Sequence, residues 1–460
     1  MNQDKPVIKL TTIEACMMTL IILGGISVSI IRYEAVPHIP IILAIFLLLL
    51  FGMLKRVSLK ELENGMIEGA KSGLGAVMLF FFIGMLISSW MASGTIPTFI
   101  YLALELVNGD FFYSVVFVVT AVVGISIGSS LTTAATLGVA FIGVSSALEL
   151  SLPITAGAII SGAFFGDKMS PLSDTTNLAS TVVKVDLFEH IKNMLWTTIP
   201  AFIISLVLFT MLSPQEIPAS FEKITSLKET LQQLNLVHYY SLVPFVILAI
   251  LAIKRVSAII TLSFGIISSL IVAFVVQKNL SINGMMELLF SGYKMDSGIE
   301  EIDQLLGRGG IESMLFSISL VLLALALGGL LFKLGVIPAL LDGMSKLFYK
   351  VPALFATTVA TAIGTNFLVG EQYLSILLTG NTFEKPFRKA GLHLKNLSRV
   401  LEDAGTVINP LVPWGVCGIY LTGVLGVSTI DYLPFTFFCL LCPLITLFYG
   451  FTGLTIVKKS

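Results

Sequence analysis

Long apolar stretches separated by short polar ones run through the whole chain of 460 residues. An apolar run of about 20 residues is long enough to cross a lipid bilayer as a helix. Runs close to this length are expected to form helices at residues 12–31, 36–54, 74–92, 111–127, 195–212, 240–253, 256–276, 313–332, 352–369, 411–425 and 432–456. Shorter or interrupted apolar pieces lie at 96–107, 132–150, 153–165, 338–348 and 372–378. The pattern predicts an all-α polytopic membrane protein, in which the interrupted pieces carry the function.

Composition agrees with this class. Hydrophobic residues make up 56% of the chain and charged residues 12%, whereas soluble domains carry roughly a quarter charged residues. A net charge of -1 gives no reason to expect nucleic acid as a partner. The four cysteines lie inside apolar runs and are expected to be small buried hydrophobic residues. We find no phosphate-binding loop, zinc spacing or nucleophile elbow, so we predict neither an enzyme nor a cofactor.

The most informative polar stretch is GAFFGDKMSPLSDTTNLAS, at residues 162–180. Pro171 lacks an N–H donor and disfavours helical geometry at Ser170, so the helix that precedes it must end there. A polar break between membrane segments is tolerated where it lines a cavity. We therefore predict a substrate site, with these candidate ligands from the first half of the chain: Asp167, Ser170, Ser173, Asp174, Thr175 and Asn177.

The chemistry of these side chains favours a hard cation such as sodium, which binds carboxylate, hydroxyl, amide and carbonyl oxygens. A carboxylate held away from water can bind a proton or a cation, but not readily both at once. Competition for Asp167 and Asp174 would exchange sodium ions for protons. The alternative for Asp167 is a structural pair with Lys168 at the end of the helix. Charged residues within the membrane are functional by default, which favours the first interpretation.

The two halves of the chain resemble each other at three places. GTIP at residues 94–97 recurs as GVIP at residues 335–338, and similar breaks follow. The displacements are 241 residues between Pro97 and Pro338, 240 between Gly124 and Gly364, and 239 between Pro171 and Pro410. Chance similarity between apolar segments is the alternative. Prolines and glycines carry the match, however, so we predict an internal repeat.

Loop charges predict how the repeats are oriented. Residues 55–71 are basic, whereas the corresponding residues 283–312 are mainly acidic. Basic loops stay in the cytoplasm, so corresponding loops are expected on opposite sides of the membrane, with the N-terminus cytoplasmic. The predicted parts are N-terminal helices (1–54), a first inverted repeat (55–194), a linker with intervening helices (195–282) and a second inverted repeat (283–460). Within the linker, residues 213–238 are expected to form a solvated loop, and residues 185–196 a surface helix before it.

Two further polar stretches are expected to form the tips of helical hairpins, GISIGSSLTTAAT at residues 124–136 and GTNFLVGEQ at residues 364–372. Small residues in such stretches also form helix-packing faces, which is the alternative for the first one. The second break lies in RVLEDAGTVINPLVPWG, where Glu402 is equally compatible with a surface ion pair to Arg399. The remaining candidate ligands are Ser129, Thr133, Asn366, Glu371, Thr406 and Asn409.

At GDKMSPLSDTTNLAS, LEDAGTVINPLVPWG and VPHIPII, the sequence resembles the NhaC-type sodium/proton antiporters of the ion transporter superfamily. The resemblance covers nearly the whole chain. It implies a sodium- and proton-coupled secondary carrier of the cell membrane with an inverted-repeat fold. It also implies a homodimer, in which a mobile substrate domain moves past a fixed scaffold as an elevator. Some members of the family exchange malate for lactate, and amino-acid transport is ascribed to others.

Our main hypothesis is exchange of cytoplasmic sodium for external protons, with Asp167 and Asp174 binding the sodium ion. The alternative is a sodium- and proton-coupled exchanger of small organic acids, or an amino-acid carrier, whose hydroxyl clusters and helix N-termini bind a carboxylate. Counterflow of labelled malate or lactate would separate the two. A channel or a structural membrane protein is a third possibility, and it would show neither saturation nor coupling of sodium to pH gradients.

Overall fold

The computed structural model describes residues 6–106, 111–214, 221–254, 256–277, 280–295, 303, 307, 309–344 and 350–458. Helices make up nearly all of the regular structure in these residues, and an isolated bridge joins Leu392 to Lys458. Among the described helices, seven are long and apolar enough to cross a membrane, or up to nine if each of two bent helix pairs is one span. The prediction of an all-α polytopic membrane protein is confirmed.

The helices follow one another with short connections. From the N-terminus they are α1 (Thr12–Tyr33), α2 (His38–Leu54), α3 (Leu59–Ser72), α4 (Leu74–Ala92), α5 (Thr95–Leu106), α6 (Phe112–Ile127), α7 (Ser130–Thr133), the π-helix η1 (Ala134–Gly138), α8 (Val139–Ala147), α9 (Leu152–Met169), α10 (Asp174–Val182) and α11 (Leu187–Leu212). The middle of the chain forms α12 (Phe221–Gln233), the 3-10 turn η2 (Tyr239–Leu242), α13 (Val243–Ile253) and α14 (Ala258–Val276).

The remainder of the chain ends in a second set of interrupted helices. They are α15 (Ile282–Ser291), α17 (Ile311–Lys333), α18 (Val336–Met344), α19 (Val351–Val369), α20 (Gln372–Lys389), α21 (Lys395–Val400), the π-helix η3 (Leu401–Thr406), the 3-10 turn η4 (Asn409–Leu411), α22 (Val416–Leu425), α23 (Thr429–Tyr432), the 3-10 turn η5 (Leu433–Phe435) and α24 (Phe437–Thr452).

Three expectations for the polar segments were wrong. The solvated loop expected at residues 213–238 contains α12, and the basic loop at residues 55–71 is mostly α3, which buries Leu62 on one face. The surface helix expected at residues 185–196 is continuous with the span after it, forming the 26-residue α11. Asp186 begins α11 by accepting hydrogen bonds from two backbone N–H groups, and no helix breaker separates the polar part from the apolar one.

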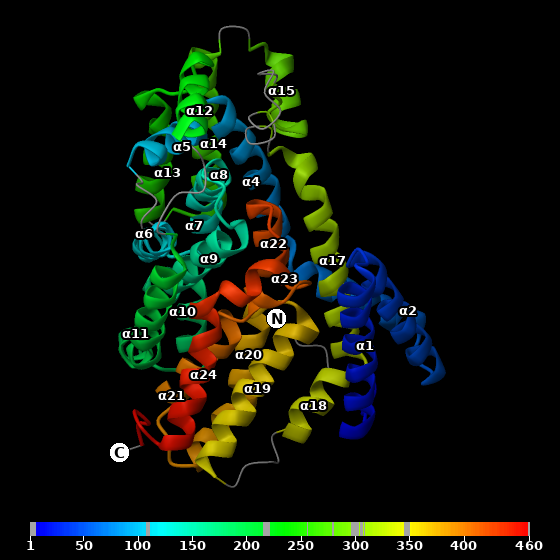
Figure 1. Ribbon diagram of the computed structural model, residues 1–460. Coiled ribbons are helices and arrows are strands. Elements are labelled where there is room, and N and C mark those ends of the chain that lie inside the picture. Colours follow the sequence, from blue (N-terminus) through cyan, green and yellow to red (C-terminus); the bar gives the residue numbers. More distant parts are fainter. Residues whose placement is uncertain are drawn as a thin grey trace.

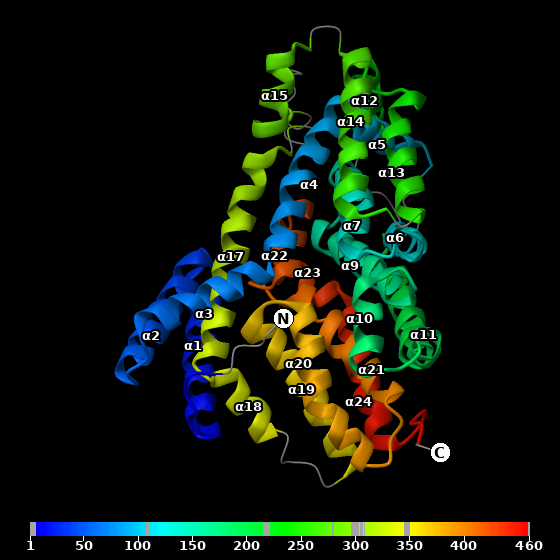
Figure 2. The same cartoon turned by 180° about the vertical axis from the view of Figure 1, so that it is seen from behind.

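Figure 1 shows α17 running along one side of the molecule, with α4 beside it. Helices α12, α13 and α14 gather toward one end with α5, whereas α18, α19, α20 and α21 lie toward the other. The view from behind in Figure 2 shows α2 and α3 on the outer side of α17. The interrupted helices α9–α10 and η3–α22 lie between the two ends, where segments far apart in the sequence meet.

Two close helix contacts depend on glycine. A Cβ atom on Gly69 of α3 would lie 2.2 Å from the carbonyl oxygen of Leu325 in α17. A Cβ atom on Gly166 of α9 would lie 2.5 Å from the Cα atom of Gly124 in α6. No side chain fits at either point, which is the small-residue packing typical of membrane helices. The packing interpretation of residues 124–136 therefore holds for Gly124.

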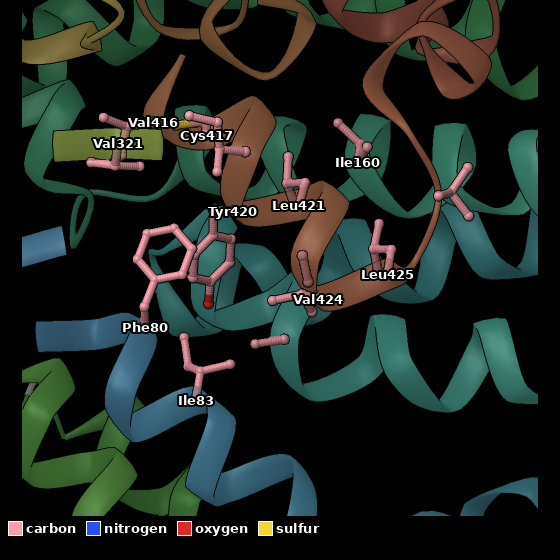
Figure 3. Packing of buried hydrophobic residues seen from close by; sticks show 14 of the residues in the cluster. Phe80, Ile83, Ile160, Val321, Val416, Cys417, Tyr420, Leu421, Val424 and Leu425 are labelled. Carbon is pink, nitrogen blue, oxygen red and sulfur yellow. The ribbon is translucent and has the colours of Figure 1, made fainter. Parts of the chain in front are cut away.

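The short helix α22 is held in an apolar core. Figure 3 shows Tyr420 of α22 beside Phe80 of α4, with the ring centroids 5.1 Å apart. The hydroxyl group of Tyr420 donates to the backbone oxygen of Leu131 in α7, at 3.1 Å. Tyr420 thus joins the second interrupted helix to α4 and to the tip of the first hairpin.

Candidate ion-binding site

The first helix break lies where the sequence predicts it. Helix α9 ends at Met169, Ser170 is extended, and α10 begins at Asp174. The hydroxyl group of Ser173 accepts a hydrogen bond from the N–H of Thr176 and caps α10. The side-chain amide of Asn177 donates to the backbone oxygens of Pro171 and Ser173, at 3.0 and 2.6 Å. Asn177 therefore bonds the carbonyl group of Pro171, which lies in the break, and adds a second donor to that of Ser173, which already accepts the N–H of Asn177.

The first hairpin tip lies directly on this break. Gly128, in left-handed geometry, ends α6, and Ser129 then caps α7. A Cβ atom on Gly128 would lie 3.0 Å from the hydroxyl oxygen of Ser170. Next to the tip, Ser130 donates a 2.7 Å hydrogen bond to one carboxylate oxygen of Asp167. The hairpin tip and the end of α9 thus build one polar centre.

The second hairpin has a tip of the same local form. Gly370, also left-handed, ends α19, and the carboxylate of Glu371 caps α20 by accepting the N–H of Leu374 at 2.8 Å. This tip lies on the second break, because the N–H of Val416 donates to the backbone oxygen of Gly370 at 2.7 Å. Each hairpin tip is therefore bonded to, or packed on, an interrupted helix.

The second break is braced by two asparagines. Asn409 donates to the side-chain oxygen of Asn366 at 2.9 Å, and its own oxygen accepts the N–H of Cys417 at 2.8 Å. Asn366 in turn donates to the backbone oxygen of Gly405 at 2.7 Å. These amides connect α19, the end of η3 and the start of α22. Both asparagines were predicted as neutral ligands, and in this structure they bind protein groups.

Asp167 and Asp174 lie in different surroundings. Asp167 is buried, and its second carboxylate oxygen has no hydrogen-bond partner among the described residues. Asp174 is exposed at the N-terminus of α10, where it accepts hydrogen bonds from the N–H of Thr175 and from the hydroxyl group of Tyr373. Tyr373 belongs to the second hairpin, so this contact joins the two halves of the chain.

The other predicted ligands are mainly bonded within their own segments. Ser129 and Thr132 share a hydrogen bond, Thr133 donates to the backbone oxygen of Ser129, and Ser173 and Thr175 share another. Ser170 accepts the N–H of Leu172. Thr406 differs, because its buried hydroxyl group has no partner in the described structure. The hydroxyl groups near the first break thus stabilise its geometry, and they can still offer lone pairs to an ion.

Lys168 does not pair with Asp167, so the alternative of a structural pair between these neighbours is wrong. Its ammonium group forms an ion pair with Asp403 of η3, and both side chains are fully buried. Asp403 also accepts hydrogen bonds from Thr197 of α11 and Thr446 of α24. A buried ion pair needs such additional bonds to offset the loss of hydration. The pair leaves Asp167 without a neutralising lysine.

Glu402 does not lie at the surface either. It is fully buried, and within the described structure it forms no ion pair with Arg399, which instead donates to Thr455. Four further participants at this centre are not among the predicted ligands: Ser130, Lys168, Tyr373 and Asp403. Ser130 lies inside a stretch that the sequence had singled out. Tyr373 and Asp403 lie far from the first half in sequence, and the fold brings them into contact with Asp174 and Lys168.

The arrangement suits a monovalent cation better than a transition metal. Among the described residues, no three His, Cys, Asp or Glu side chains come together as a metal centre would require. Asp167 offers one free carboxylate oxygen, and hydroxyl and carbonyl oxygens surround the break. Oxygen ligands of this kind suit hard cations. Such an ion would be transported cargo, not a resident cofactor.

Comparison with known proteins agrees with this chemistry. The sequence pattern of the Na+/H+ antiporter family matches residues 162–454. The chain is 41% identical over 446 residues to the Na(+)/H(+) antiporter NhaC of Alkalihalophilus pseudofirmus, with 96% of each chain covered. It is 42% identical over 417 residues to NhaC of Bacillus subtilis, covering 90% of this chain and 92% of that one. Over 442 residues it is 34% identical to the malate-2H(+)/Na(+)-lactate antiporter of Bacillus subtilis, with 94% of each covered.

The family match covers more than half of the chain, including both helix breaks and the second hairpin. The similarity to the two NhaC proteins extends over nearly the full length of each. The resemblance inferred from the motifs is therefore confirmed. The chain belongs to the Na+/H+ antiporter family, a family of secondary transporters and not of enzymes.

Proposed function

We propose that this protein is a secondary active transporter that exchanges cytoplasmic sodium ions for external protons across the cell membrane. The observation that carries the proposal is the state of Asp167. Its carboxylate lies buried at the end of an interrupted helix, with one oxygen bound by Ser130 and the other free. A carboxylate in such a place can hold a proton or a sodium ion, and competition between them couples the two fluxes. The names of the two NhaC relatives support the same exchange.

Asp174 is the second proposed carboxylate. Its exposure supports a role in receiving the ion, and its contact with Tyr373 lies between the first interrupted helix and the second hairpin. In this scheme Asp174 attracts the ion, and Asp167 holds it without water. The hydroxyl groups and amides around the two breaks serve as neutral ligands or hold the backbone in place: Ser129, Thr133, Ser170, Ser173, Thr175, Asn177, Asn366, Thr406 and Asn409. Glu371 caps the second hairpin beside them.

The proposal can be tested with purified protein in proteoliposomes that contain a pH-sensitive dye. An outward sodium gradient should drive proton uptake in the unchanged protein. Asp167→Asn and Asp174→Asn should each abolish this movement, because an amide cannot exchange a proton for a cation. Glu287→Gln, which alters an exposed carboxylate on α15, is the matched control and should leave exchange unchanged. Undiminished exchange in Asp167→Asn would remove this carboxylate from the mechanism.

Exchange of small organic acids is the second candidate, favoured by the similarity to the malate/lactate antiporter. An anionic substrate would need free backbone N–H groups, such as those at the N-termini of α10 and α20. Both N-termini already have side-chain caps, from Ser173 and Glu371. The carboxylate of Glu371 would also repel an anion. These contacts favour a cation over an anion as the substrate. Counterflow of labelled malate or lactate would instead support the exchange of organic acids.

The proposed architecture is an inverted repeat that works as an elevator. The matching local geometry at Gly128 and Gly370 supports the repeat, since both glycines are left-handed and both precede a residue whose side chain caps the next helix. Gly94 and Gly335 form another left-handed pair, at φ of 76° and 78°. A homodimer, a cytoplasmic N-terminus and a mobile substrate domain complete the proposal, as the family resemblance implies.

A further inference from the structure

A buried carboxylic acid near Asp167 has no assigned role. Glu402 lies in η3, is fully buried, and has no hydrogen-bond partner for either carboxylate oxygen among the described residues. Buried polar groups are nearly always hydrogen-bonded, and a carboxylate without bonds in an apolar interior is costly. Both oxygens of such a side chain can bind a proton or a cation.

The charged groups around Glu402 leave it without a counter-ion. Asp167, Lys168 and Asp403 are the charged groups near Glu402. The ammonium group of Lys168 is already paired with Asp403. Arg399, in α21 just before η3, points toward α24, where it lies over the ring of Tyr449. Two acidic side chains, Asp167 and Glu402, therefore share a region in which Lys168 is paired with Asp403 and Arg399 is directed at α24.

Neighbouring hydroxyl groups are free as well. Thr406 follows Glu402 by one helical turn, and its buried hydroxyl group has no partner within the described part of the chain. Helix α20 packs along η3, because a Cβ atom on Gly405 would lie 3.6 Å from the hydroxyl oxygen of Ser375. Thr379, one turn after Ser375 on the same face of α20, has another buried hydroxyl group without a described partner. Free oxygens thus reach this region from α9, α20 and η3.

The backbone at Glu402 also has an unusual geometry. Residues 401–406 form a π-helix, in which the N–H of Val407 donates to the backbone oxygen of Glu402 at 3.3 Å. Short π-helical segments are rare and often mark functional sites. The wider turn displaces Glu402 from the position that an α-helix would give it.

We infer that Glu402 is a further carboxylate ligand of the cation bound by the free oxygen of Asp167, and that the hydroxyl groups of Thr406 and Thr379 complete this site. The ion is sodium if the proposed function holds, and the inference rests on that proposal for the identity of the ion. Carboxylate and hydroxyl oxygens are the ligands that hard cations prefer. A cation here would neutralise the two acidic side chains and occupy their free lone pairs.

Sodium binding to purified protein in detergent tests the inference without transport. Binding of labelled sodium and the rise of the melting temperature in sodium chloride, relative to choline chloride, are the two measurements. A ligand that binds the folded state stabilises it according to its affinity. We expect Glu402→Gln to weaken sodium binding at least tenfold and to remove most of the sodium-dependent shift. Glu402→Asp should retain part of both, and Glu287→Gln should behave as the unchanged protein.

Several outcomes would overturn the inference. Equal sodium affinity and an equal temperature shift in Glu402→Gln would show that the side chain is a neutral, buried acid with no bound cation. If Glu402→Gln fails to fold, Thr406→Val is measured in its place. This change removes one hydroxyl group at similar volume and should weaken sodium binding by a smaller factor. Normal binding in Thr406→Val would then reject the site. Failure of the main proposal looks different, because the unchanged protein would bind sodium without moving protons.

Discussion

Tyr373 is the side chain through which the second hairpin reaches the first interrupted helix. Its hydroxyl group donates to the carboxylate of Asp174, and the two residues are 199 positions apart in the sequence. Both side chains are exposed, so in the proposed scheme this bond lies where an ion would enter. A hydrogen bond to an ionised group contributes about 1.5–3 kcal/mol, and exposure places this one near the lower limit.

We therefore expect Tyr373→Phe to raise the half-saturating sodium concentration for exchange by about tenfold, which corresponds to roughly 1.4 kcal/mol. The phenyl ring keeps the packing of the hairpin tip and removes the donor to Asp174. The measurement is sodium-driven proton uptake in proteoliposomes over a range of sodium concentrations. Tyr239→Phe is the control, because that side chain is exposed on η2. An unchanged sodium dependence in Tyr373→Phe would show that Asp174 does not need this donor.

At the scale of elements, the breaks were predictable and the contacts between them were not. Proline at position 171 forces the end of α9, and glycines at 128 and 370 provide the left-handed turns of the hairpins. These effects act within a few residues, so the sequence contains them. The pair of Lys168 with Asp403 spans 235 positions, and a lysine followed by distant acids does not identify its partner. Glu402 shows the same limit of sequence-based prediction, because its burial rules out the surface ion pair with Arg399.

The pair of Lys168 and Asp403 holds α9 against η3, with α11 and α24 contributing Thr197 and Thr446. Removing one member of a buried ion pair leaves an uncompensated charge and typically costs about 3–5 kcal/mol. Lys168→Met and Asp403→Asn should therefore each lower the melting temperature strongly. The double variant should recover much of that loss, because neither charge remains.

A thermal-unfolding cycle in detergent over the four proteins measures this coupling. Additive losses in the double variant would mean that the two side chains act independently. The cycle also bears on the mechanism. If the pair separates when the substrate domain moves, the double variant should be stable and yet exchange sodium at a different rate. A double variant with normal stability and normal exchange would limit the pair to a role in folding.

At the scale of the whole molecule, the length of α17 matches the thickness of a membrane. Its 23 residues rise about 34 Å, enough to cross a hydrocarbon core of about 30 Å. Helix α3 packs along the C-terminal half of α17, where a Cβ atom on Gly65 would be 2.8 Å from the Cβ of Lys333 and one on Gly69 would be 2.2 Å from the carbonyl oxygen of Leu325. The end of α15 lies at its N-terminal end, where a Cβ atom on Gly310 would be 2.7 Å from the carbonyl oxygen of Phe290. Figure 2 shows the same separation of α3 from α15.

This geometry supports the proposal that the segment 55–71, with Lys55 and Arg56 just before α3, is cytoplasmic and that α15 is external. Lys60→Cys and Glu287→Cys, each in a protein whose exposed Cys16 is replaced by Ser, provide one exposed thiol per helix. A membrane-impermeant maleimide should label Lys60→Cys in everted vesicles and Glu287→Cys in right-side-out vesicles. The Cys16→Ser protein alone is the control for reaction at the three buried cysteines. Labelling of both positions from one side would contradict the inverted repeat, because corresponding segments of inverted halves must face opposite compartments.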